Sequence, residues 1–447
     1  MIGNVAASRF RKIHFVGIGG AGMNGIAEVL KAHGFEVSGS DARESETLRR
    51  LEKLGIEVHV GHDAKWVEDA DLVVYSSAVP KDNPERLAGV ARGIPVIRRA
   101  EMLGELMRLK YSIAVAGTHG KTTTTSMIGQ IWNQANLRPT IIVGGIVDKL
   151  GGGAQYGESD YLIAEADEYD RSFLHLHPNI SIINSIDSDH LDIYGDRQHL
   201  VQSFNDFASL TEKQVIIKEG LDVNADNAIR FGFGEGCDYR AEIIRSENGI
   251  TDFVIIGEGQ TTNVKLPMAG RHNMLNATAA FVAARQVGIA PEAIAQALAT
   301  FKGVKRRFDI RVNNAKHCYI DDYAHHPSEI KACLTAVREA FKGKKITLVF
   351  QPHLFSRTRD FMDDFAEALA LADELILLDI YPARELPIEG ITSEALLHNV
   401  QLADKQLCTK QQLIPLIDSK KPEILITMGA GDIDRFVEPL EKQVKTW

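Results

Sequence analysis

The chain has 447 residues, of which 45% are hydrophobic and 25% are charged. This composition is typical of a folded globular protein and excludes a disordered or fibrous chain. Its 50 Lys and Arg against 60 Asp and Glu give a formal net charge of -10, without a block of basic residues. We therefore expect neither nucleic acid nor a membrane as a partner. At roughly 150 residues per domain, the length suggests about three domains.

The cysteines and the apolar runs indicate the compartment. Four cysteines are scattered without the spacing of a zinc site, which predicts reduced thiols. No apolar run approaches the ~20 residues that a membrane span needs, and the start MIGNVAASRFRK lacks an apolar signal core. We expect a soluble cytoplasmic protein that is a monomer or a weak homodimer.

The first part of the chain alternates strands and helices. A β-prone run at 13–16 enters a glycine loop at 17–22, and apolar residues then recur at helical spacing up to Gly34. Further strands are predicted at 35–37, 56–60, 71–75 and 94–97, with a helix around 48–54. This alternation predicts a doubly wound, mostly parallel sheet of the Rossmann type.

Two further α/β units follow. After a helix at 101–108, strands are predicted at 112–116, 140–143, 161–164 and 180–183, a polar β pair at 251–256 and 262–266, and helices at 274–287 and 291–301. The third unit has predicted strands at 319–321, 346–350, 374–378 and 423–427. We predict three α/β domains, at 1–108, 109–308 and 309–447.

The stretch AVAGTHGKTT at 114–123 indicates a phosphate site. A strand leads through a glycine loop into a helix, so backbone N–H groups and the helix N-terminus face an anion. Lys121 supplies a positive charge to the terminal phosphates, and the Thr122 hydroxyl can ligate magnesium. The glycine expected at position 115 is Val115, so this is a variant phosphate loop. The alternative is a structural turn with a chance lysine.

The earlier loop matches G-x-G-x-x-G through Gly17, Gly19 and Gly22, and Asp41 ends the next strand. This pattern is typical of NAD binding. Its physics requires only a pyrophosphate at a helix N-terminus, so a nucleotide-sugar diphosphate satisfies it equally. A purely structural turn is the third reading.

Carboxylates follow two predicted strands of the second unit. Glu165-Ala166-Asp167-Glu168 comes directly after one strand, and Asp187-Ser188-Asp189-His190 follows another. Carboxylates at the carboxyl end of a strand are well placed to hold Mg²⁺ opposite a phosphate loop. Solvated acidic loops are the alternative.

Together with other motifs, these residues resemble those of a known family. The chain resembles the Mur ligases, the ATP-dependent amino-acid ligases of peptidoglycan synthesis, over nearly its whole length. The resemblance rests on HFVGIGGAGMNGIAEVL, SSAVPKDNPE, IPVIRRAEML, GTHGKTTTT, EADEYDRSFLHLHP, SDHLDIYG, GRHNMLNA, GVKRRFD, DDYAHHP, QPHLFSRTRD, DIYPARELPIEG and GAGDI. The first loop, RRAEML, DDYAHHP and YPA-x-E favour the branch that adds the first amino acid of the stem peptide.

The resemblance implies an N-terminal UDP-binding Rossmann-like domain, a central phosphate-loop ATPase and a C-terminal Rossmann-like domain that helps to bind the amino acid. It implies the small-molecule partners UDP-N-acetylmuramate, L-alanine and ATP, with ATP and Mg²⁺ as cofactors, and it favours a UDP-sugar over NAD at the first loop.

The same resemblance implies roles for individual residues. ATP is expected at Gly117, Thr118, His119, Gly120, Lys121, Thr122, Thr123, His272, Asn273, Asn276, Arg307 and Asp322. The metal is expected at Thr122, Glu165 and His190. The UDP-sugar is expected at Gly19, Ala21, Gly22, Met23, Asp41, His62, Ser76 and Ser77. The amino acid is expected at Tyr323, His325 and Arg357, and the catalytic candidates are Lys121, His326, His353 and Arg357.

Three positions depart from the family's pattern. Leu354 and Phe355 stand where the family often has Arg and Tyr, and Tyr169 stands where the alanine-adding enzymes usually have Ser. Tyr at that position is a feature of the related ligase that recycles murein tripeptides, which is the alternative within the family. Outside it, the alternatives are an NAD-dependent oxidoreductase and a nucleotide-binding switch without ligase activity.

Overall fold

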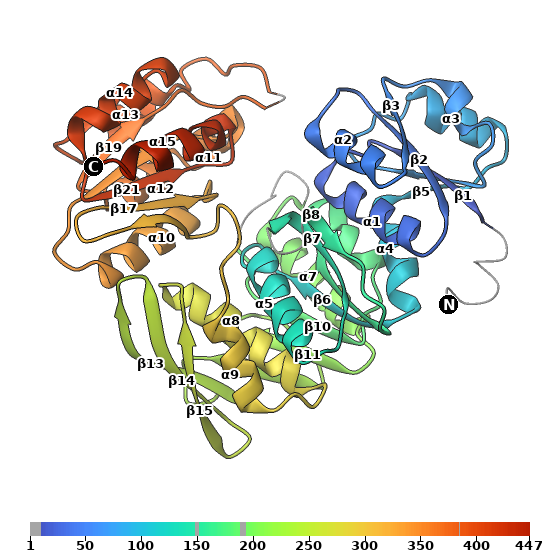
Figure 1. Cartoon of the computed structure of the whole chain (residues 1–447), viewed down its shortest axis with the longest axis horizontal. Coiled ribbons are helices and arrows are strands. Elements are labelled where there is room, and N and C mark those ends of the chain that lie inside the picture. The colour runs from blue at the N-terminus through green and yellow to red at the C-terminus, as the bar shows by residue number, and fades with distance from the viewer. Residues whose placement is uncertain (1–9, 148–151, 188–193, 384) are drawn as a thin grey trace. The chain divides into compact units, whose positions relative to one another are not determined.

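The computed structural model describes residues 10–147, 152–187, 194–383 and 385–447 (Figure 1). It contains three sheets, and every sheet is mostly or wholly parallel. By compactness the chain divides into two units. One comprises Met1–Glu242, Ile255–Thr262 and Leu275–Leu298, and the other comprises Ile243–Val254, Asn263–Met274 and Ala299–Trp447.

The first unit begins with a five-stranded parallel sheet in the order β3-β2-β1-β4-β5. Its strand order reverses beside β1, so the loops after β1 and β4 meet at one edge, where α/β sheets bind ligands. The elements are β1 (Lys12–Val16), α1 (Ala21–Ala32), β2 (Glu36–Asp41), α2 (Glu46–Lys53), β3 (Glu57–Val60), β4 (Leu72–Tyr75), α3 (Pro84–Ala91), β5 (Val96–Arg98) and α4 (Arg99–Arg108), with a 3-10 turn η1 (Ala64–Val67).

A ten-stranded sheet follows, in the order β15-β14-β13-β12-β11-β10-β6-β9-β7-β8. Its centre is apolar on both faces, because β6 and β10 are buried along almost their whole length. The elements are β6 (Tyr111–Ala116), α5 (Lys121–Gln134), β7 (Thr140–Val147), β8 (Gly152–Gln155), β9 (Tyr161–Ala166), η3 (Tyr169–His175), β10 (Ile180–Ile183), α7 (Arg197–Ser209), β11 (Gln214–Lys218), β12 (Ala228–Gly232), β13 (Tyr239–Glu247), β14 (Ile250–Gly257), β15 (Gln260–Leu266), α8 (Arg271–Arg285) and α9 (Pro291–Ala299).

One hydrophobic core joins the two sheets of the first unit. Buried residues of the first sheet and its helices, such as Phe15 and Ile26, belong to the same cluster as Ile142 and Ala154 of β7 and β8. The cluster continues through α4 with Leu103. Because this packing is continuous, side chains at the end of β9 lie near the first glycine loop.

The second unit contains a six-stranded sheet in the order β16-β17-β21-β18-β19-β20, in which only the β16–β17 pair is antiparallel. The elements are β16 (Asp309–Asn313), β17 (Cys318–Asp322), α10 (Pro327–Ala340), β18 (Ile346–Phe350), α11 (Phe355–Asp360), α12 (Met362–Leu369), β19 (Glu374–Leu377), α13 (Ser393–Asn399), β20 (Lys405–Leu407), α14 (Lys410–Lys420), β21 (Ile424–Met428), η4 (Asp432–Phe436) and α15 (Val437–Val444).

The predicted fold class is confirmed: the chain has the three-domain α/β fold with mostly parallel sheets. The predicted polar β pair is present as β14 and β15, and β13 adds a third strand that the sequence analysis missed. Among the described helices, none is long and apolar enough to cross a membrane.

Candidate active site

The phosphate loop lies between β6 and α5, as the sequence predicts. Gly117 and Gly120 both have positive φ, +133° and +83°. The loop is tied to the chain after β10, because Ser185 Oγ lies 2.9 Å from Thr118 Oγ1 and accepts the His119 N–H at 2.8 Å. A Cβ on Gly117 would lie 2.9 Å from the Ser185 nitrogen, so only glycine suits this position.

Lys121 is the first residue of α5 and its ammonium group is held inside the loop. Nζ donates to the Gly117 carbonyl at 2.7 Å and to both carboxylate oxygens of Glu168, at 2.7 and 3.0 Å. Burial disfavours the charged form, but Glu168, Asp167 and Glu165 outweigh it and raise the pKa of Lys121 above its usual value. Lys121 is therefore charged, and a carboxylate occupies the place where a phosphate would bind it.

Glu165 and Thr122 face each other across this loop, and they fit a magnesium ion. The Thr122 side chain hydrogen-bonds Glu165, while burial raises the pKa of Glu165. Glu165 Oε1 is buried and has no hydrogen-bond partner among the described residues. A hydroxyl and a buried carboxylate oxygen are hard oxygen donors of the kind that Mg²⁺ prefers. The described residues contain no ready-made group of three or more His, Cys, Asp or Glu ligands, and His190 lies outside them.

Helix α8 carries the predicted adenine residues His272, Asn273 and Asn276. Asn276 is buried, and a Cβ on Gly120 would clash with its side-chain oxygen. Asn276 therefore lies directly against the phosphate loop. Asn273 is buried and donates to the Ala269 carbonyl at 2.7 Å, which orients it toward its own helix start. The other predicted loop residue, Thr123, is buried at the start of α5.

The first glycine loop is held by the acid at the end of β2. Gly19 N–H donates to Asp41 Oδ2 at 2.9 Å, and Gly17 turns the chain with φ +82°. In an NAD site the corresponding acid would bind a ribose hydroxyl. Here Asp41 accepts the N–H of Gly19, which gives this acid a structural role in holding the loop.

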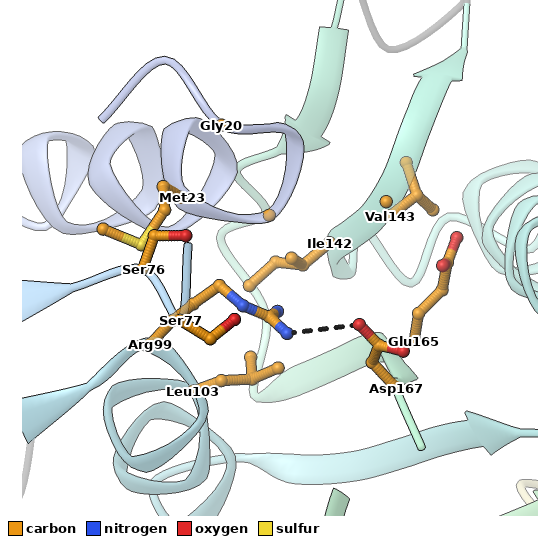
Figure 2. A pocket seen from close by; sticks show the side chains of 12 residues that line it. Gly20, Met23, Ser76, Ser77, Arg99, Leu103, Ile142, Val143, Glu165 and Asp167 are labelled. Carbon is orange, nitrogen blue, oxygen red and sulfur yellow. Dashed lines mark ion pairs between the residues drawn. The ribbon is translucent and has the colours of Figure 1, made fainter. Parts of the chain in front are cut away.

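A cavity of about 250 Å³ lies beside this loop and reaches the end of β9 (Figure 2). It brings together predicted UDP-sugar residues of the first sheet and the predicted metal ligand Glu165. Its lining residues are Gly20, Gly22, Met23, Ser76, Ser77, Arg99, Leu103, Ile142, Val143, Gly144, Glu165 and Asp167. Ala21 begins α1 next to this cavity, while Asp41 and His62 are absent from its lining.

His62 belongs to a separate buried network. Its Nδ1 lies 2.8 Å from Glu85 Oε1, and the other carboxylate oxygen lies 2.8 Å from His14 Nε2 and accepts from Ser40 Oγ at 2.7 Å. His14 and Glu85 are fully buried. Burial opposes ionisation of Glu85, but the hydrogen bonds from His14, Ser40 and His62 hold its pKa below the usual value.

The second unit gathers most of the remaining predicted residues at the carboxyl ends of β17 and β18. Asp322 accepts the N–H groups of Phe308 and Ala324 at 2.7 and 2.8 Å, and burial raises its pKa to about 6. The guanidinium of Arg307 lies 4.8 Å from the centre of the Tyr323 ring and its Nη1 lies 3.7 Å from Glu329.

Two histidines lie together in this cluster. The ring centres of His325 and His353 are 6.1 Å apart, and Arg357 Nη1 lies 3.4 Å from His353 Nδ1. Burial, together with Arg357, lowers the pKa of each histidine to about 4. Both rings are therefore neutral at neutral pH, and each can accept a hydrogen bond. His326 instead caps α10, with Nδ1 beside Ser328 and its ring 4.7 Å from that of Phe361.

Four residues at these sites were missed as individual site residues: Glu168, Arg99, Glu329 and Glu85. Glu329 accepts the N–H of His325 at 3.0 Å and orders the loop before α10. Glu168, Arg99 and Glu85 stood inside motifs that the sequence analysis quoted, and a charged residue within such a motif was the available signal. The partners of Glu85 come from three other segments, around His14, Ser40 and His62, which the motif alone does not reveal.

Models of one family match all three parts of the chain. Residues 12–111 match the Mur ligase family, catalytic domain; residues 115–284 match the Mur ligase middle domain; and residues 306–431 match the Mur ligase, glutamate ligase domain. The chain belongs to the Mur ligase family and is an enzyme, a ligase.

Individual relatives indicate which members of the family this chain resembles. The chain is 41% identical to a UDP-N-acetylmuramate–L-alanine ligase of Cytophaga hutchinsonii over 97% of each chain. The crystal structure of UDP-N-acetylmuramate-alanine ligase from Thermotoga maritima is 31% identical, with a TM-score of 0.81 over 96% of this chain and 99% of that one. A UDP-N-acetylmuramate:L-alanyl-gamma-D-glutamyl-meso-diaminopimelate ligase from Neisseria is also 31% identical, but it covers 66% of this chain and all of its own, with a TM-score of 0.60.

Proposed function

We propose that this enzyme joins L-alanine to the lactyl carboxylate of UDP-N-acetylmuramate, with ATP converted to ADP and phosphate. The 41% identity to an alanine ligase over 97% of each chain is the observation that carries the proposal. The reaction belongs to the synthesis of peptidoglycan precursors. We propose a cytoplasmic location, and a monomer or weak homodimer as the working form.

The chemistry begins with activation of a carboxylate, because an unactivated carboxylate does not react with an amine. The lactyl carboxylate attacks the γ-phosphorus of ATP, and the bond to the β-phosphate oxygen breaks, which gives an acyl phosphate and ADP. The amine of L-alanine then attacks the acyl carbon, and the tetrahedral intermediate releases phosphate as the amide forms.

The first step brings two anions together, so cancelling negative charge is the main task. In the proposed mechanism Lys121 leaves Glu168 and binds the terminal phosphates, while the amides of residues 117–122 surround them. Thr122 and Glu165 would hold Mg²⁺, which supplies further charge neutralisation when bound. The cavity beside Glu165 supports this arrangement, because it also reaches the first glycine loop where we place the UDP-sugar.

The remaining predicted residues divide between the two other substrates. We assign Asn276, with His272 and Asn273 on the same helix, to the adenine side of ATP, and Arg307 and Asp322 to its phosphate and ribose side. His325, His353, Arg357 and Tyr323 form the proposed amino-acid site. A neutral His353 or His325 can accept a hydrogen bond from the amine and orient it toward the acyl carbon.

The tripeptide-recycling ligase is the alternative within the family, and the Neisseria relative supports it over two thirds of the chain. Tyr169, the residue that suggested it, is 44% exposed. In an NAD site the acid after the second strand binds the ribose hydroxyls, whereas Asp41 accepts the N–H of Gly19. That contact counts against an oxidoreductase.

The decisive experiment measures phosphate release from ATP with UDP-N-acetylmuramate while each amino acid and the L-Ala-D-Glu-diaminopimelate tripeptide are added singly. We expect release with L-alanine and formation of an amide product identified by mass spectrometry. Release with the tripeptide alone would reverse the assignment, and hydrolysis without any amide product would favour the nucleotide-binding switch.

A further inference from the structure

Arg99 occupies a special position in the cavity beside the first glycine loop. Of the described residues that line this cavity, it is the one cation, and it faces two carboxylates, Glu165 and Asp167. Figure 2 shows its guanidinium extending from the start of α4 past Ser77 toward Asp167. The side chain is only 21% exposed, so a cation is held in a mostly enclosed place.

The guanidinium is only loosely paired there. Its Nη2 lies 3.6 Å from Asp167 Oδ2, which is longer than a charge-assisted hydrogen bond of about 2.7–2.9 Å. Asp167 is itself 44% exposed, so water competes with this ion pair. Arg99 is therefore available to a stronger anion that enters the cavity.

The last glycine of the first loop makes room for this side chain. A Cβ on Gly22 would lie 2.9 Å from Arg99 Nη1 and 3.2 Å from its Cζ. Gly22 is the second residue of α1, whose first N–H groups face an anion in sites of this kind. The guanidinium and the first turn of α1 therefore border the same space.

We propose that Arg99 binds the diphosphate of the UDP-sugar, and that Asp167 is the weakly paired counter-ion which the diphosphate displaces. This inference rests on the proposed function, since it takes the UDP-sugar to be the ligand of this cavity. A planar guanidinium gives two parallel hydrogen bonds to phosphate oxygens, a geometry that lysine does not reproduce. Gly22 is required because the guanidinium needs the space that a side chain would fill.

The test compares binding of two ligands to the full chain by calorimetry: UDP-N-acetylmuramate and UDP-N-acetylglucosamine, which has the diphosphate but no lactyl carboxylate. We expect Arg99→Met to weaken both by the same factor, about tenfold to a hundredfold, since hydrogen bonds to charged groups are lost. Arg99→Lys should recover only part of this loss.

The neighbouring arginine is a matched control. Arg98 is next in sequence, is 49% exposed, lies 3.6 Å from Asp170 and does not line the cavity, so Arg98→Met should leave both affinities unchanged. Asp167→Asn should tighten binding of both ligands, because it removes the competing carboxylate while keeping the shape. A merely structural Asp167 would not give tighter binding.

The outcomes separate the inference from the proposed function. Unchanged affinity in Arg99→Met overturns the inference, and loss of affinity for UDP-N-acetylmuramate alone would assign Arg99 to the lactyl carboxylate instead. If the wild-type chain binds neither UDP-sugar, the proposed function fails first. Circular dichroism on each variant establishes that it is folded.

Discussion

Lys121 has a partner in the structure that its sequence motif does not predict. Its place at the start of α5 follows from the strand, the loop and the helix. Its bidentate partner, Glu168, lies 47 residues away and is 2% exposed. A buried ammonium group without a counter-ion would lower the stability of the folded chain, and the Glu168 carboxylate offsets this free-energy cost.

We expect Lys121→Ala to slow ADP formation by at least about 100-fold, since losing one such donor typically costs about 3 kcal/mol in the transition state. Binding of the UDP-sugar should survive, because its site lies in the other glycine loop. A coupled ADP assay and calorimetry measure the two effects. Lys110→Ala is the control, since its ammonium donates to the Ser159 carbonyl and not to the loop. Normal ADP formation in Lys121→Ala would remove the loop from the mechanism.

The paired histidines predict a dependence of stability on pH. The pKa values of His325 and His353 fall from the usual 6.5 to about 4 in the folded protein. Between these values the unfolded chain binds more protons, so these groups make the free energy of unfolding fall as pH falls from 6.5 to 4.

We therefore expect His353→Asn to reduce the slope of the unfolding free energy against pH in this range. The reduction should correspond to at most one bound proton. Urea unfolding at a series of pH values measures it. The exposed His398, on α13, provides the control His398→Asn, which should leave the slope as in the wild type. An unchanged slope in His353→Asn would mean that His353 titrates normally.

At the scale of elements, the start of α5 depends on one residue with a left-handed backbone conformation. Gly120 caps this helix with φ +83°, and an added Cβ would also clash with Asn276 of α8. Gly288 has the same φ of +83° but nothing lies within 4 Å of the place where its Cβ would be.

The two glycines make a matched pair. Gly288→Ala should cost about 1–2 kcal/mol of stability, the cost of an L-residue in this conformation. Gly120→Ala should cost more than this, because Asn276 must also move, and it should weaken ATP binding. Denaturant unfolding and nucleotide titration measure the two effects. Equal losses of stability would show that Asn276 does not press on the loop.

The elements that the sequence predicted well are those with a strong local pattern. The strands at 180–183 and 346–350 agree with β10 and β18 residue for residue, because both are short, fully buried runs in which all residues but one are apolar. The strands β8, β11, β12, β13, β16 and β20 were missed. β8 is Gly-Gly-Ala-Gln, which has no apolar period, and β13 exposes most of its second half. Both owe their place to pairing with neighbours, which a local pattern does not contain.

The residues of the candidate site also divide into those that a local sequence pattern predicts and those that it does not. The two glycine loops were found because their function needs a fixed spacing within one segment. The roles of the C-terminal residues came from the family resemblance, and the structure brings Arg307, Tyr323, His325, His353 and Arg357 into one cluster. The partners of Glu85 became visible only through long-range contacts, which one sequence does not reveal.

At the scale of the whole molecule, the chain consists of two compact units, and we keep the three predicted domains, 1–108, 109–308 and 309–447, as a proposal. Chains with several units often unfold in more than one step. A ligand stabilises the unit that it binds, by about 2.7 kcal/mol at a concentration 100 times its Kd.

Differential scanning calorimetry should therefore resolve two transitions, and UDP should raise the midpoint of one of them and leave the other in place. UDP binds, in our proposal, to the unit that contains the first glycine loop. Uridine, which lacks the diphosphate, serves as the control and should give a smaller shift. A single transition that moves as a whole would mean that the entire chain unfolds cooperatively.

The carboxylate that pairs with Lys121 has a consequence for the binding of small anions. Inorganic phosphate and sulfate are abundant small anions, and an unshielded ammonium in a ring of amides would attract them. A resident Glu168 already neutralises that charge, so a lone small anion gains little by entering, whereas a nucleotide adds contacts along its whole length. The enzyme should thus tolerate phosphate buffers while it still selects a triphosphate.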